Sequence, residues 1–70
     1  MMPLLMAGIG NEVTIRKIGG PEETRHYLNN MGFTEGAKCS VVSSANGNII
    51  VNIRDVRVAI GSDMAKRIMI

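Results

Sequence analysis

Residues 38–60 read KCSVVSSANGNIIVNIRDVRVAI, and they predict three consecutive β-strands. In 38–44, 49–54 and 56–60, apolar residues recur two positions apart, which is the period of a strand with one buried face. Asn46 and Gly47 separate the first two strands, and Asn-Gly is the strongest short hairpin signal because both residues tolerate positive φ. Asp55 marks a second tight turn. The stretch therefore predicts a meander of three short strands.

The same alternation sorts the side chains of these strands onto two faces. One face carries, in chain order, Cys39, Val41 and Ser43, then Ile49, Val51 and Ile53, then Val56, Val58 and Ile60. The last three of these are predicted to point into the core.

Upstream of the meander, the chain predicts one more strand and one helix. Residues 12–18 alternate as a strand does and end at a Gly-Gly pair. Pro21 then suits the first turn of a helix, which the pattern extends over residues 21–31 and ends at Gly32. Thr24, Tyr27, Leu28 and Met31 share one face of this helix.

Downstream of the meander, residues 62–66 predict a short helical turn and 67–70 a last strand. The total is about five short strands with one helix after the first, in an all-β domain. Strands this short need closure into a small barrel to remove their exposed edges. An SH3-like barrel is the simplest solution, since an OB-fold carries its helix after the third strand. The apolar residues 1–9 are predicted to pack on the barrel as an arm.

Length and composition predict a small, single-domain cytoplasmic protein. Seventy residues make one domain, 1–70, with a thin core and little room for an enclosed active site. One cysteine excludes an internal disulfide and favours the cytoplasm, and the apolar start is far too short to cross a membrane. A net charge of +2, scattered along the chain, and two aromatic residues argue against nucleic-acid binding.

Catalytic groups are sparse. Cys39 and His26 are the only residues of their kinds, and nothing in the pattern brings them together, so the chain is predicted not to be an enzyme. No closely spaced set of Cys or His predicts a zinc site, and no cofactor is expected. His26 and Glu22, at i and i+4 of the helix, are the candidates for a weak surface site for a divalent metal.

Several segments, taken in order, resemble the FeoA family of ferrous iron transport accessory proteins. The resemblance covers almost the whole chain, and its most specific part is the helix end Leu28-Asn29-Asn30-Met31-Gly32-Phe33 together with Gly36. The other matching segments are Pro3-Leu4, Ile18-Gly19-Gly20, Val41-Val42, Val58-Ala59-Ile60, Met64-Ala65 and Ile68-Met69-Ile70.

The resemblance implies an SH3-like barrel without enzymatic activity that acts in the cytoplasm on FeoB, the membrane transporter with a cytosolic GTPase domain. The helix and the loop after it are the expected docking surface, with Arg25, Tyr27, Leu28 and Met31 as candidate contacts. Leu28 and Met31 qualify only where they are exposed, because their helical spacing equally fits the core.

Two other functions stay open on the sequence. Similar domains occur at the carboxyl terminus of iron- and manganese-dependent repressors, so a metal-responsive domain is the main alternative. A small nucleic-acid-binding barrel is the least favoured alternative. Barrel edges and the apolar arm also suggest self-association.

Overall fold

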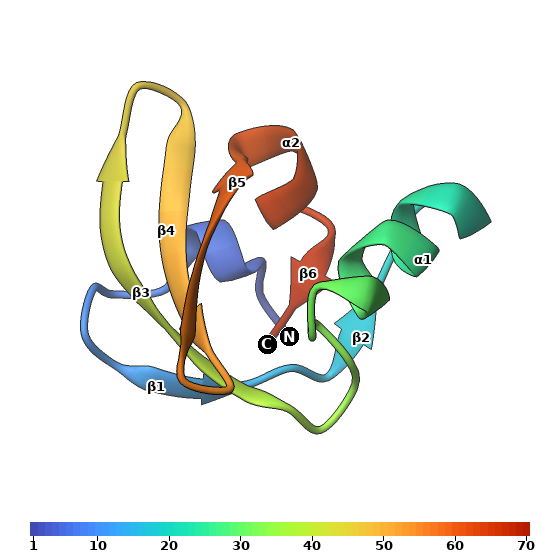
Figure 1. The fold of residues 1–70 in the computed structure, drawn as a ribbon, viewed down its shortest axis with the longest axis horizontal. Coiled ribbons are helices and arrows are strands. Elements are labelled where there is room, and N and C mark those ends of the chain that lie inside the picture. The colour runs from blue at the N-terminus through green and yellow to red at the C-terminus, as the bar shows by residue number, and fades with distance from the viewer.

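The computed structural model describes residues 1–70 and contains six strands and three short helices (Figure 1). The strands are β1 (Glu12–Thr14), β2 (Lys17–Ile18), β3 (Lys38–Ala45), β4 (Asn48–Ile53), β5 (Val56–Gly61) and β6 (Ile68–Met69). The helices are α1 (Glu22–Asn30), α2 (Ser62–Ala65) and the 3₁₀ helix η1 (Leu4–Met6). No helix is long and apolar enough to cross a membrane.

Two sheets form the domain. The larger has the order β1-β3-β4-β5, and the smaller pairs β2 with β6; all neighbouring strands are antiparallel. The predicted meander is confirmed. Both of its turns have two residues at positive φ, Asn46 with Gly47 and Arg54 with Asp55, as tight hairpin turns of type I′ require.

The predicted strand over residues 12–18 is wrong in one respect, because it is two strands that belong to different sheets. The chain passes from one sheet to the other at a bend, or corner, at Ile15. Ile15 is buried and exchanges backbone hydrogen bonds with Ala37 and Gly36. Arg16 then donates its backbone N–H to Met69 of the other sheet at 2.8 Å. Alternation continues through such a corner, so periodicity alone does not reveal it.

Simple alternation fails at two positions of the meander, Ser43 and Val56, of which only Val56 is predicted to point into the core. A bulge between Val41 and Ser43 shifts the register of β3 against β4, so Ser43 is exposed although Cys39 and Val41 are buried. Val56 is 58% exposed because it follows the tight turn at the end of the sheet, beyond the core, whereas Ile60 at the other end of β5 is buried.

The predicted helix is confirmed to within one residue at each end. Pro21 precedes its first turn, and Gly32 follows its cap at φ +104°, a conformation that glycine adopts without strain. The Phe33 N–H closes the end by donating to the Leu28 carbonyl at 3.0 Å. Leu28 is the only buried residue of α1, so the helix is held to the barrel near its carboxyl end.

The core is entirely apolar. It contains thirteen buried residues, drawn from every strand except β1 and from all three helices: Leu4, Ile15, Ile18, Leu28, Phe33, Cys39, Val41, Ile49, Val51, Ile53, Ile60, Ala65 and Ile68. The amino-terminal arm packs on the barrel as predicted, because Leu4 is fully buried and the backbones of Met2 and Ile70 exchange two hydrogen bonds. The two chain ends therefore meet (Figure 1).

Candidate docking site

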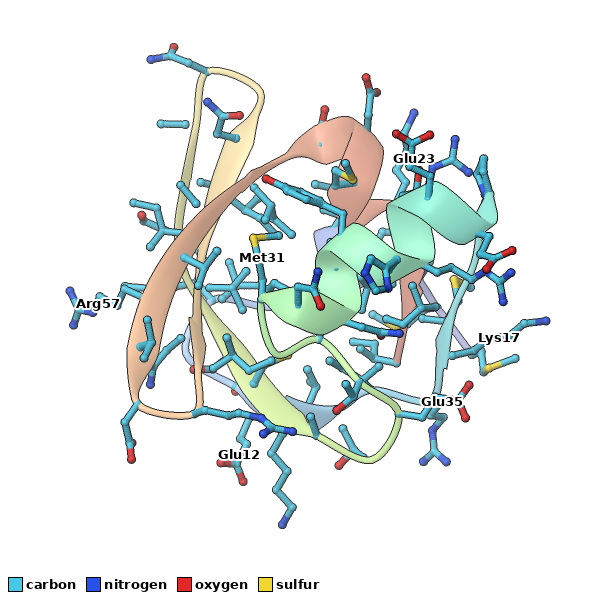
Figure 2. All side chains as sticks on the ribbon, turned by 45° about the vertical axis from the view of Figure 1, so that its right-hand side comes forward. Glu12, Lys17, Glu23, Met31, Glu35 and Arg57 are labelled. Carbon is cyan, nitrogen blue, oxygen red and sulfur yellow. The ribbon has the colours of Figure 1, made fainter.

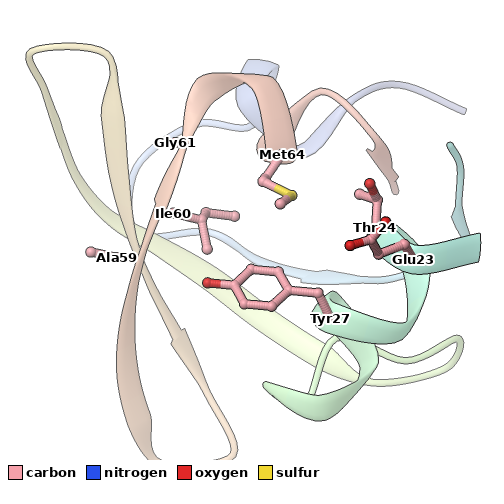
Figure 3. A pocket seen from close by; sticks show the side chains of 7 residues that line it. All are labelled: Glu23, Thr24, Tyr27, Ala59, Ile60, Gly61 and Met64. Carbon is pink, nitrogen blue, oxygen red and sulfur yellow. The ribbon is translucent and has the colours of Figure 1, made fainter. Parts of the chain in front are cut away.

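A groove of about 370 Å³ lies between α1 and β5 and is closed at one end by α2 (Figure 3). We call it the α1–β5 groove. It is lined by seven residues: Glu23, Thr24, Tyr27, Ala59, Ile60, Gly61 and Met64.

The helix provides one wall of this groove. Thr24 and Tyr27 are three residues apart and so lie on the same face of α1, with Glu23 beside them. The Tyr27 ring extends from the helix toward β5 (Figure 3), yet 52% of the residue stays exposed. An aromatic ring that is half accessible at the mouth of a groove is a typical anchor for a protein partner.

The sheet and α2 provide the other wall and the floor. Ile60 points into the groove and is buried, and Met64 reaches in from α2 (Figure 3). Ala59 is exposed, and its side chain projects from β5 on the side opposite Ile60 (Figure 3). Glu23 is the one residue of the lining that carries charge at neutral pH, so the groove combines an apolar floor with an acidic end.

The structure places the four predicted contact residues in different settings, and only Tyr27 lies in the groove. Tyr27 lines the groove, and Arg25 is exposed on α1 but outside the lining. Leu28 is fully buried, so it takes the core role that its spacing also allowed and offers no surface to a partner. Met31 is partly buried and packs against the core, with only its exposed part available.

The two predicted metal ligands lie on the solvent side of α1. His26 and Glu22 are both exposed, one helical turn apart. No group of three or more His, Cys, Asp or Glu side chains in the structure is placed to hold a metal ion. A site at His26 and Glu22 would therefore have two protein ligands at most, fewer than the three or four of known zinc sites.

Sequence reasoning missed most of the groove. Of its lining, only Tyr27 is among the predicted contacts, while Thr24 is predicted only to share its helical face and Ile60 only to point into the core. The signal that would have found the β5 residues is the position of β5 at the edge of the sheet. That position depends on which strands pair, which local periodicity does not determine.

A second groove, of about 420 Å³, lies near the chain ends. It is lined by Met2, Ala7, Gly8, Asn11, Val13, Thr14, Arg16 and Ile70. Nearby in the sequence, Met1, Met6 and Ile9 are each more than 60% exposed. Self-association through this apolar arm remains a prediction.

Cys39 is a core residue and not a reactive group. Burial raises the pKa of its thiol, and the nearby Glu12 carboxylate raises it further. Both effects disfavour the thiolate, which is the nucleophilic form of cysteine.

We expect the raised pKa of Cys39 to appear as a dependence of stability on pH. The unfolded thiol releases its proton near pH 8.5, whereas the folded thiol keeps it to higher pH. This contribution to the free energy of unfolding is complete below pH 8.5 and is lost as pH rises through the folded-state pKa. Urea unfolding of the wild type and of Cys39→Ala from pH 7 to 10 measures it. The loss of stability should be steeper in the wild type, and parallel curves would contradict the assignment.

Comparison with known proteins agrees with the architecture. The family model described as the FeoA domain matches residues 2–70. A relative from Methanocaldococcus jannaschii, provisionally assigned as Fe(2+) transport protein A, is 34% identical over 70 residues, which is all of this chain and 85% of the relative.

Two solved structures superpose closely on this one. A crystal structure described as the iron uptake regulatory protein FeoA is 36% identical, with a TM-score of 0.90 over 97% of this chain and 92% of the other. FeoA of Stenotrophomonas maltophilia, solved with zinc and described as a prokaryotic SH3 domain protein, has a TM-score of 0.85 over 99% of this chain and 88% of the other. At 17% identity, the similarity to this structure is evidence for the fold alone. It confirms the predicted SH3-like fold.

Proposed function

The chain belongs to the FeoA family, and on this basis we propose that it is a non-enzymatic cytoplasmic accessory protein of ferrous iron uptake. It docks to the cytosolic, GTPase-containing part of a FeoB-type membrane transporter and regulates it. The names of the relatives support the transport role: one is an Fe(2+) transport protein and the other an iron uptake regulatory protein.

The observation that carries docking is the α1–β5 groove with the half-exposed Tyr27 at its mouth. The groove contains neither histidine nor cysteine, so it lacks the usual nucleophile and base. What its residues do offer is apolar surface around an accessible aromatic ring. Such an arrangement suits binding to another protein.

Tyr27 is the central contact in this proposal. Arg25 on the same helix, and the exposed part of Met31 directly after it, contribute to the rim of the interface. Rim residues contribute little energy but exclude water from the centre. Leu28 contributes indirectly, because its burial holds α1 against the barrel and so fixes the position of Tyr27.

The direct test is a pull-down of the cytosolic domain of the FeoB-type transporter from the same organism. The domain is prepared without nucleotide, with GDP and with a non-hydrolysable GTP analogue. We expect the chain to retain the domain in at least one of these states. Failure to bind in all three would contradict the proposal.

A further inference from the structure

The outer edge of β5 is open. β5 is the last strand of its sheet and pairs only with β4, over six residues without a bulge. None of the backbone hydrogen bonds formed outside the helices and strands involves Val56–Gly61. The other edge strand of this sheet, β1, has only three residues.

The hairpin turn determines which backbone groups of β5 face outward. In a two-residue hairpin, the residues that flank the turn, here Ile53 and Val56, exchange both of their hydrogen bonds. Bonded and non-bonded pairs then alternate, so Val56, Val58 and Ile60 bond to β4. The N–H and C=O groups of Arg57, Ala59 and Gly61 therefore face the free edge.

Two of the three residues with outward groups, Ala59 and Gly61, line the α1–β5 groove. A strand edge protected from unwanted pairing usually carries lysine, proline or a bulge. β5 has no lysine, proline or bulge, and Arg57, its one charged residue, points away from the groove in Figure 2. The edge is thus unprotected where an apolar groove adjoins it.

We propose that the groove binds an extended segment of a partner protein, which pairs with β5 as an additional strand. This inference deepens the proposed function, since it names the kind of segment that docks. Main-chain hydrogen bonds to Arg57, Ala59 and Gly61 hold the segment, and alternate side chains enter the groove.

The lining of the groove specifies the chemistry of the segment. Side chains two apart lie on the same face of an added strand, so apolar residues at this spacing pack on Ile60, Met64 and Tyr27. Glu23 is unpaired and is the only charged residue of the lining, so a lysine or arginine of the segment pairs with it.

A second copy of the chain fits this edge less well than a single strand does. Each copy carries its own α1 beside its own β5 (Figure 3), so pairing two β5 edges would bring each helix against the other barrel. Dimerisation through β5 is therefore an outcome that would overturn the proposal.

Ala59 provides a matched pair of variants. Its N–H faces outward, so Ala59→Pro removes a donor from the free edge and keeps the hydrogen bonds to β4, as edge prolines do. Ala59→Thr keeps the donor. Glu23→Lys and Glu22→Lys form a second pair, because only Glu23 lines the groove.

The test uses short linear peptides displayed on phage and selected on the wild-type chain. We expect the selected sequences to alternate apolar residues and to carry a lysine or arginine. A synthetic peptide of this kind should bind Ala59→Thr as the wild type and bind Ala59→Pro at least about tenfold more weakly, a loss of about 1.4 kcal/mol. Glu23→Lys, but not Glu22→Lys, should also weaken binding of this peptide.

Amide exchange in the wild-type complex gives a readout that needs no variant to fold. The amides of Arg57, Ala59 and Gly61 should exchange more slowly with the peptide bound. Unchanged exchange, equal binding to both Ala59 variants, a β5-mediated dimer, or the absence of any selected peptide would overturn the inference. Binding of peptides without binding of the transporter's cytosolic domain would support the strand-addition site and contradict the proposed partner.

Discussion

Phe33→Ala is expected to unfold a large fraction of the molecules at 25 °C. Phe33 is fully buried and is the largest side chain of the core. Truncating a buried phenylalanine costs about 3–5 kcal/mol in lost burial and in the cavity that remains. At about 0.05–0.15 kcal/mol per residue, a domain of 70 residues has a total stability of the same order. Urea and thermal unfolding followed by circular dichroism measure the change.

The chain offers a matched control for this variant, because Tyr27 is its only other aromatic residue. Tyr27 is 52% exposed, so Tyr27→Ala should change the free energy of unfolding by about 1 kcal/mol or less. If the two variants melted alike, the positions of the two rings in the structure would be wrong.

Tyr27→Ala is expected to weaken binding to the transporter's cytosolic domain by about thirtyfold or more. Truncation of an aromatic residue at the centre of an interface typically costs about 2 kcal/mol or more. The loss arises because the ring is the one large apolar side chain of the groove that is exposed, and the helix already positions it. Isothermal titration calorimetry measures the change.

His26→Ala is the matched control for binding. His26 is the neighbouring residue of α1, is exposed, and lies outside the groove lining. Its removal should leave the dissociation constant within about threefold of the wild-type value. Equal losses in both variants would mean that the helix contacts the partner through another face, and no loss in either would exclude α1 from the interface.

Turn chemistry and helix ends were predictable because they depend on local sequence. Asn46 and Gly47 select a hairpin turn by their tolerance of positive φ, and the structure has both at positive φ. Pro21 and Gly32 delimit the helix for reasons contained in those residues themselves. The number of hairpins and the place of the helix followed, and they were enough to select the SH3-like barrel.

Features that depend on contacts between distant residues were not predictable. The corner at Ile15 exists because two sheets meet there, and the bulge at Val42 alters a face only through its pairing with β4. Tyr27 and Leu28 share one helical face, yet one is half exposed and the other fully buried. Periodicity identifies the face of a helix but not which of its residues reaches the barrel.

We propose docking of the chain to the cytosolic domain of a FeoB-type transporter through the α1–β5 groove. Titration of the ¹⁵N-labelled chain with that domain, followed by amide chemical shifts, tests it most directly. We expect the largest shifts on α1 and β5, around Tyr27 and Ala59. Shifts confined to the second groove, around Asn11 and Arg16, or no shifts in any nucleotide state, would contradict it.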